Sequence, residues 1–305
     1  MKLGSIGVWA AIDGPISNFE SPASGDLGPA SAERIAAFAR RVEALGYTSL
    51  WMPEGIGRNS LVTSCWLLAN TTSLHVATGI AVIHSRDAIA MRGAADALNE
   101  QSNGRFILGL GVSHRRVVEG MRGHDYGKPL TAMVTYLDAM AQAPYMAAPP
   151  AAPTPIILAA LRDKMIALSG SKTQGAHSYN VTPTHTARAR AILGPEPLLC
   201  VEQPMILETD PLKAREIARS ELALYLGLEN YLNAWLEMGF EEKDFADGGS
   251  DRFIDAIVAW GDKAALQKRV DEHLEAGASH VCIKALAPDC STDMRVLECL
   301  APNAR

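Results

Sequence analysis

Three side chains that can exchange protons stand at the ends of short apolar runs in this chain. Glu54 and His114 directly follow such runs, and His84 closes one. A positioned carboxylate or imidazole can donate or accept a proton near neutral pH, so these three residues are the first candidates for acid–base catalysis. The alternatives are that each histidine is a hydrogen-bonded loop residue and that Glu54 is a carboxylate paired with Arg58.

The runs belong to a unit that repeats eight times: a short apolar run, a loop and an amphipathic helix. Strands that alternate with helices of about a dozen residues pair in parallel, because parallel neighbours need a crossover connection. The pattern therefore predicts an α/β fold, a (β/α)8 TIM barrel, with functional residues at the carboxyl ends of its strands. The predicted strands are residues 3–9, 49–53, 74–84, 105–113, 155–161, 177–181, 198–207 and 279–286.

Two regions depart from the repeat. Residues 141–155 are rich in alanine and proline and show no periodicity, which indicates a loop between the fourth and fifth units. Residues 209–260 carry more helical pattern than one crossover needs. We therefore expect residues 1–305 to form a single barrel domain with a helical insertion at 209–260, between strands seven and eight.

The composition excludes several classes of protein. The 305 residues are 48% hydrophobic and carry a net charge of −6, with a pI of about 5.8, so there is no basic footprint for nucleic acid. No apolar run reaches the ~18 residues of a membrane span, and the first residues lack the pattern of a signal peptide. Five scattered cysteines show no metal-ligand spacing, so we expect no metal site and a cytoplasmic protein with reduced thiols.

Three blocks of sequence resemble a known family. They are residues 45–54, residues 78–84 followed by 104–112, and residues 277–281. Their order and spacing resemble the bacterial luciferase-like superfamily of flavin and deazaflavin oxidoreductases. The chain is most similar to its mycobacterial-type branch, which is associated with coenzyme F420.

The resemblance implies a tricyclic cofactor ring across the carboxyl-terminal mouth of the barrel. In that family a bulge in the third strand, often with a cis peptide, backs the ring, and the matching peptide here is Gly79–Ile80. Val112 and Ser113, at the end of the fourth strand, are expected beside it. The alternative for Gly79 is an ordinary strand glycine that allows close packing.

The resemblance also implies a phosphate site after the fifth strand. The matching turn is Ala159, Ala160, Leu161 and Arg162, where backbone N–H groups and a helix N-terminus would cradle the phosphate. Thr182, after the sixth strand, matches a position that can hydrogen-bond a phosphate, and its alternative is a solvated loop threonine. Trp9 would wall the substrate side together with the loop 11–30 and the insertion, whereas Trp51 is expected in the core.

One departure from the family bears on mechanism. Many F420-using relatives have an Asp followed by a His after the second strand, whereas this chain has Glu54-Gly55. We therefore expect Glu54, His84 or His114 to handle the proton in a hydride transfer between F420 and a small organic substrate. The alternatives are an FMN-dependent monooxygenase and a non-catalytic barrel. The expected partners are a small-molecule substrate and a second copy of the chain in a homodimer, with neither nucleic acid nor membrane.

Overall fold

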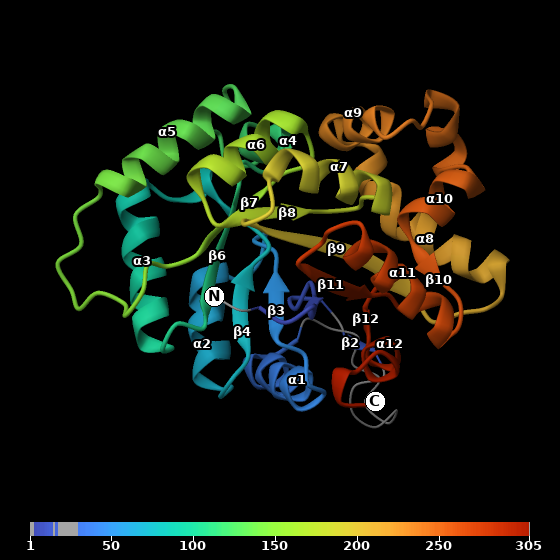
Figure 1. The fold of residues 1–305 in the computed structure, drawn as a ribbon, viewed down its shortest axis with the longest axis horizontal. Coiled ribbons are helices and arrows are strands. Elements are labelled where there is room, and N and C mark those ends of the chain that lie inside the picture. The colour runs from blue at the N-terminus through green and yellow to red at the C-terminus, as the bar shows by residue number, and fades with distance from the viewer. Residues whose placement is uncertain (1–2, 15, 18–29, 305) are drawn as a thin grey trace.

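The computed structural model describes residues 3–14, 16–17 and 30–304, so most of the loop 11–30 lies outside the described residues. In the described part of the chain, eight parallel strands close into a barrel with helices around it (Figure 1). The last of them, β11, pairs with β1 and places Val281 opposite Ile6, which closes the ring. The predicted barrel is confirmed. Its strands in order are β1 (Ile6–Trp9), β3 (Ser49–Met52), β4 (His75–Thr78), β6 (Phe106–Gly111), β7 (Ile156–Ala159), β8 (Gly175–Ser178), β9 (Leu198–Ile206) and β11 (His280–Ala285).

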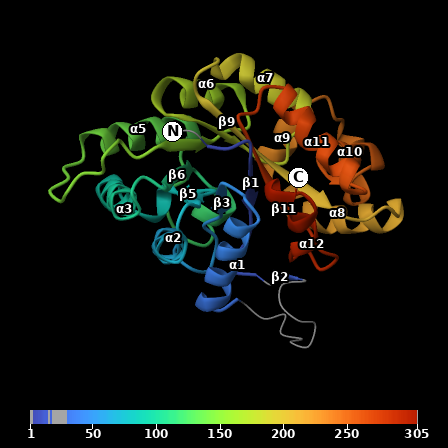
Figure 2. The ribbon, with the colours of Figure 1, turned by 60° about the horizontal axis from the view of Figure 1, so that its bottom comes forward.

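Helices connect these strands on the outside of the barrel. Figure 2 shows α1, α2 and α3 next to one another on one side, with α8, α10 and α11 on the other. The helices outside the insertion are α1 (Ala32–Ala44), α2 (Ser60–Ala69), α3 (Ala88–Gln101), α4 (Arg115–Val118), α5 (Pro129–Gln142), α6 (Asp163–Lys172), α7 (Pro183–Leu193), α11 (Lys263–Glu275) and α12 (Met294–Cys299). Short 3-10 turns occur at η1 (Ile83–Ser85) and η3 (Pro302–Ala304).

Local sequence signals set where these helices begin and end. The Ser31 hydroxyl accepts a hydrogen bond from the N–H of Arg34 at the start of α1, and Asp262 does the same for Ala265 at the start of α11. Gly46 follows α1 with a φ of 89°, a left-handed conformation that favours glycine. The two N-caps start their helices, and Gly46 turns the chain from α1 toward β3.

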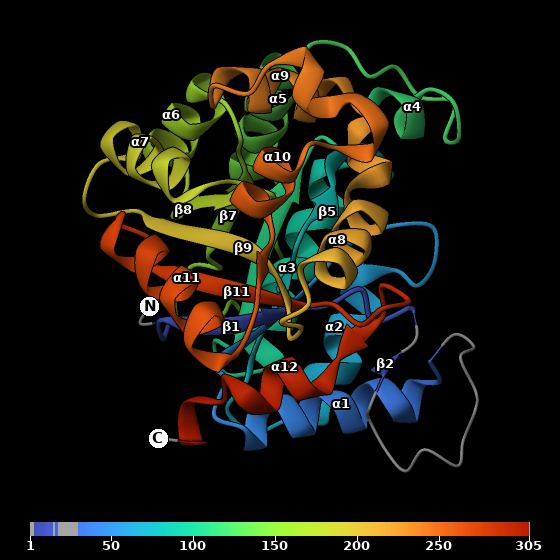
Figure 3. The same ribbon diagram turned by 90° about the vertical axis from the view of Figure 1, so that its right-hand side faces the viewer.

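The predicted insertion is confirmed between β9 and β11. It begins with α8 (Pro211–Leu226) and α9 (Glu229–Glu237), and continues through η2 (Glu242–Gly248), α10 (Asp251–Ile257) and the short strand β10 (Ala259–Trp260), which pairs with β9. It has its own apolar cluster around Trp235 and Phe253. Figure 3 shows α9 and α10 at the end of the barrel away from α1 and α12.

Some strand boundaries differ from the prediction. The third predicted strand, 74–84, divides into β4 and β5 (Ala81–Val82), because the chain bulges between them. The sixth strand, β8, begins at Gly175 and ends at Ser178, whereas 177–181 was predicted. Its apolar pattern is weak, so the sequence did not define its bounds. A small pair outside the barrel joins β2 (Ile16–Ser17) to β12 (Thr292–Asp293).

A cluster of buried side chains from β1, β3, β4, β6, β7, β9 and β11 fills the inside of the barrel. Trp51 lies there fully buried, as expected, in the same cluster as Cys200 and Cys282. Among residues 3–14, 16–17 and 30–304, no helix combines the length and apolar character needed to cross a membrane.

Candidate active-site cleft

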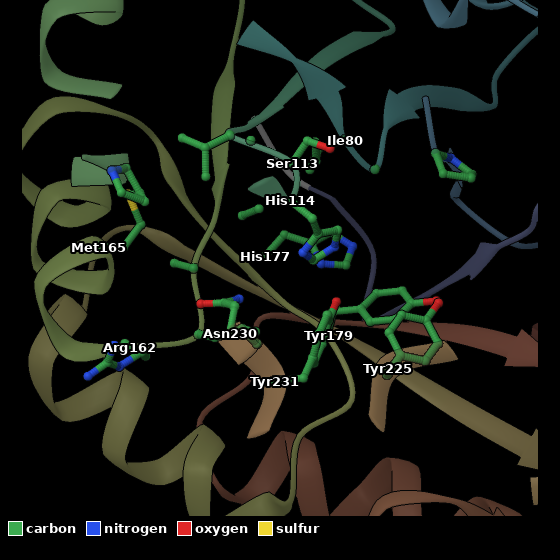
Figure 4. A pocket seen from close by; sticks show the side chains of 18 of the residues that line it. Ile80, Ser113, His114, Arg162, Met165, His177, Tyr179, Tyr225, Asn230 and Tyr231 are labelled. Atoms are coloured by element: carbon green, nitrogen blue, oxygen red, sulfur yellow. The ribbon is translucent and has the colours of Figure 1, made fainter. Parts of the chain in front are cut away.

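A cleft of about 940 Å³ opens at the carboxyl ends of the barrel strands, where α8 and α9 of the insertion form part of its wall. Both the barrel loops and the insertion contribute side chains to it (Figure 4). The predicted site residues that line it are Trp9, Glu54, Gly79, Ile80, Val112, Ser113, His114, Ala159, Ala160, Leu161 and Arg162. The structure therefore brings together residues from positions 9 to 162 of the chain.

The bulge between β4 and β5 forms one wall of the cleft. Its Gly79–Ile80 peptide is cis, as the resemblance implied. The Gly79 carbonyl accepts a hydrogen bond of 3.1 Å from the Trp9 indole, and the Ile80 carbonyl accepts one of 3.1 Å from the N–H of Glu54. A side chain at Gly79 would meet the Trp9 ring at 2.8 Å, so glycine is required for this contact. The Ile80 side chain is thereby held against the cleft.

Glu54 is tied to the backbone and side chains that follow the bulge. Its carboxylate pairs with Arg86 and accepts hydrogen bonds from the N–H of Val82 at 2.7 Å and the hydroxyl of Ser85 at 3.0 Å. Burial raises the pKa of Glu54, but these donors, with Arg86 foremost, outweigh it and hold the pKa below its ordinary value. An ionised carboxylate with its oxygens engaged favours a positioning role over proton donation.

The alternative in which Glu54 pairs with Arg58 is wrong about the partner. Arg58 pairs with Asp13 at 2.9 Å instead, because the chain after Glu54 leads Arg58 toward the loop that follows β1. Arg86, 32 residues away from Glu54, supplies the cation.

Two other predicted site residues are not among the described residues that line the cleft. His84 lies in the η1 turn, where its ring packs 5.8 Å from that of Tyr126, which does line the cleft. The Thr182 hydroxyl caps α7 by accepting a hydrogen bond of 3.3 Å from the N–H of His185. The hydroxyl oxygen of Thr182 therefore caps the start of its own helix.

His114 lies in the cleft with its ring 5.8 Å from that of Tyr231 on α9. Burial lowers its pKa, so its imidazole is neutral at neutral pH and has one donor and one acceptor nitrogen. Of the three acid–base candidates, His114 has the placement that suits exchange with a bound ligand.

Sequence patterns did not single out a set of polar residues at one end of the cleft. We call Tyr179, Tyr225, Glu221 and Lys284 the cleft floor. Lys284 could have been noticed as a lysine inside the apolar run of the eighth strand. Tyr225 and Glu221 lie on α8, and nothing local shows that this helix returns to the barrel mouth.

His177 on β8 was also missed. It is buried among the cleft residues, and its Nε2 has no hydrogen-bond partner among the described residues. Burial, with help from His280, lowers the pKa of His177 to about 3, so the ring is neutral. Its ring packs against Trp51 at 4.7 Å. A neutral nitrogen of this kind can bind a ligand inside the cleft.

The opposite end of the cleft is charged. We call Arg162, Lys164 and Arg188 the basic rim. Two of its members are paired: Arg162 contacts Glu237 of α9 at 2.6 Å, and Arg188 contacts Asp163 at 2.7 Å. These side chains are about half exposed, so a ligand anion can exchange with the carboxylates at small cost. The rim adjoins the start of α6, which lacks a side-chain cap.

Residues 16–280 match the model of the luciferase-like monooxygenase family. The chain belongs to this family. A Mycobacterium tuberculosis protein named as a coenzyme F420-dependent oxidoreductase is 28% identical over 271 residues, which is 87% of this luciferase-like chain and 69% of that protein.

Solved structures agree with the family fold. An F420-dependent secondary alcohol dehydrogenase in complex with an F420–acetone adduct has a TM-score of 0.75 at 12% identity, covering 99% of both chains. The coenzyme F420-dependent tetrahydromethanopterin reductase of Methanopyrus kandleri has a TM-score of 0.72 at 16% identity, covering 98% of both chains. At these identities the likeness shows that the luciferase-like barrel is shared.

Proposed function

We propose that this luciferase-like protein is an F420-dependent oxidoreductase that moves a hydride between the deazaflavin and a small organic substrate. The observation that carries the proposal is that one cleft joins an apolar wall at Ile80 and Val112 to the basic rim. That combination suits a planar ring with an anionic tail, which F420 has. The F420-dependent relative in Mycobacterium tuberculosis supports the same cofactor.

The residues present fit such a group. Ala159 and Ala160 are small residues of the cleft lining, and Gly111 leaves room for Ile80 at the wall, because a Cβ there would meet the Ile80 side chain at 2.5 Å and Ala159 at 3.3 Å. At the rim, the guanidinium of Arg162 and the N-terminus of α6 offer donors to a phosphate. When bound, F420 would supply the two-electron hydride chemistry.

The chain's own residues would then orient the reactants and handle the proton. Ile80 would support the ring, and Trp9 together with α8 and α9 would exclude water from the space beside it. His114, a neutral imidazole in the cleft, could accept or donate a proton at a nitrogen. Glu54 would hold the bulge in place through Val82.

A titration with two cofactors tests the proposal. Purified protein is titrated with F420 and, separately, with FMN, while the fluorescence of each ring is followed. We expect saturable binding of F420 and none of FMN at the same concentrations. Binding of FMN alone would favour the FMN-dependent monooxygenase, and binding of neither would favour the non-catalytic barrel.

The basic rim gives a second expected result. Arg162→Glu should weaken F420 binding by about 10-fold or more at low ionic strength, because a charged hydrogen bond is typically worth ~1.5–3 kcal/mol. Glu237→Gln should tighten it by roughly 2- to 5-fold, since the carboxylate that competes for Arg162 is gone. The fluorescence titration at low and high salt measures both effects.

Glu241→Gln is the matched control. It removes the same charge from an exposed carboxylate that pairs with Lys243, away from the cleft, and should leave F420 affinity unchanged. An Arg162→Glu variant that binds F420 as tightly as the parent at low salt would remove Arg162 from the cofactor site.

A further inference from the structure

Two tyrosine hydroxyls meet at the cleft floor. Tyr179 follows β8 and Tyr225 lies on α8, and their oxygens are 2.8 Å apart. Figure 4 shows the two side chains together at one end of the cleft, with Arg162 at another. We call Tyr179 and Tyr225 the tyrosine pair. Both line the cleft, so a bound ligand can reach them.

The pair has one hydroxyl hydrogen more than its own contacts use. Lys284 donates to the Tyr179 oxygen at 2.6 Å, and an ammonium group accepts nothing in return. The bond between the two hydroxyls uses one of their two hydrogens, whichever residue donates it. Neither hydroxyl has a further hydrogen-bond partner within the described ranges. One phenol hydrogen is therefore left for a ligand.

The charge of the cleft floor is balanced. Lys284 forms an ion pair with Glu221, and both side chains are at most 10% exposed. Burial lowers the pKa of Lys284, but Tyr225 and Glu221 outweigh it, so the group stays an ammonium. Because Glu221 neutralises that ammonium, the floor suits an uncharged acceptor rather than an anion. Burial raises the pKa of Tyr179 and keeps it a neutral phenol.

Trp9 connects the tyrosine pair to the wall at the bulge. Its indole N–H donates to the Gly79 carbonyl at 3.1 Å, and its ring packs edge-on against Tyr179 with centroids 5.2 Å apart. The Lys284 ammonium lies 4.8 Å from the same ring. The Trp9 ring thus lies between the tyrosine pair and the bulge, and all of them line the same cleft.

We propose that the tyrosine pair, supported by Lys284, is the hydrogen-bond donor for the carbonyl oxygen of an uncharged aldehyde or ketone substrate. This inference rests on the proposed function, in which the reduced deazaflavin is the hydride donor. The carbonyl carbon gains the hydride, the C=O π pair moves to oxygen, and that oxygen takes the phenol proton. The phenolate, beside the Lys284 ammonium, regains a proton from solvent.

A carbonyl dye tests the donor without any turnover. 4-(Dimethylamino)cinnamaldehyde is uncharged, and its absorption moves to longer wavelength when its oxygen accepts a hydrogen bond. We expect a red shift on binding to the parent protein. Tyr179→Phe should reduce the shift and weaken dye binding by roughly 2- to 10-fold, the usual range for one hydrogen bond. Tyr225→Phe should keep part of the shift, because Tyr179 and Lys284 remain, and the double variant should abolish it.

Controls separate this inference from the proposed function. Tyr145→Phe, in the loop after α5 and outside the cleft lining, should behave as the parent. F420 titration of each variant should give unchanged affinity, since the floor lies apart from the basic rim. A full red shift in the double variant, or none in the parent protein, would overturn the proposal. Failure of F420 to bind the parent protein would instead overturn the proposed function, and the dye result would stand by itself.

Discussion

Replacing Gly109 with alanine is expected to lower the free energy of unfolding by about 3 kcal/mol or more, at or beyond the upper end of the usual cost of overpacking. A Cβ on Gly109 would lie 1.8 Å from the Thr78 carbonyl oxygen, and the Thr78 hydroxyl donates to the Gly109 carbonyl at 2.7 Å. The obstacle is backbone in the neighbouring strand, which cannot rotate away. Strands β4 and β6 would have to separate beside the bulge.

The same change should also weaken F420 binding, because β4 leads directly into the bulge that forms the cleft wall. Denaturant unfolding and the fluorescence titration measure the two effects. Gly93→Ala is the matched control: Gly93 lies in α3, and a Cβ there has no atom within 4 Å. It should be stabilising by about 0.5–1 kcal/mol, as alanine is favoured over glycine in helices. A Gly109→Ala variant as stable as the parent would contradict the close strand contact.

Replacing Glu54 with glutamine is expected to cost about 3 kcal/mol at neutral pH, because breaking a buried ion pair typically costs ~3–5 kcal/mol. The Glu54 side chain is 4% exposed and that of Arg86 is 12% exposed, so the guanidinium would lose its counter-charge away from water. The NH2 group of the new glutamine would also place N–H donors beside the Arg86 guanidinium, which has only donors itself. Denaturant unfolding measures the loss.

The pH dependence of this loss follows from the pKa of Glu54. Burial raises that pKa, but Arg86 and the Val82 N–H lower it more, so the folded-state pKa lies below the ordinary value of 4.5. A group of this kind contributes stability that is fully present above about pH 4.5 and is lost as the pH falls through its folded-state pKa. The difference between the parent and Glu54→Gln should therefore shrink on acidification below pH 4.5.

Asp13→Asn is the control for this pair. Asp13 and Arg58 are also a carboxylate and a guanidinium, but their side chains are 42% and 36% exposed, so the variant should lose less than ~1 kcal/mol. If Glu54→Gln were no more damaging than Asp13→Asn, the buried pair would not be what holds the bulge.

Local sequence was enough to predict the barrel and part of its site. Apolar runs that alternate with capped helices, such as the helix between Ser31 and Gly46, specify their elements from neighbouring residues. Parallel pairing then gathers the strand ends at one face, so Trp9, Ile80 and His114 could be expected in one cleft. The bulge was predicted from the resemblance of residues 78–84 to the family.

Tertiary structure alone decided which polar groups meet. Glu54 is paired with Arg86 rather than Arg58, and Thr182 caps its own helix. Lys284 meets Glu221 from 63 residues away and Tyr179 from 105 residues away. Short-range periodicity specifies an element and its buried face. The partner of a charged or phenolic side chain depends on how distant elements pack, because long side chains can turn to whichever opposite charge the fold brings within reach.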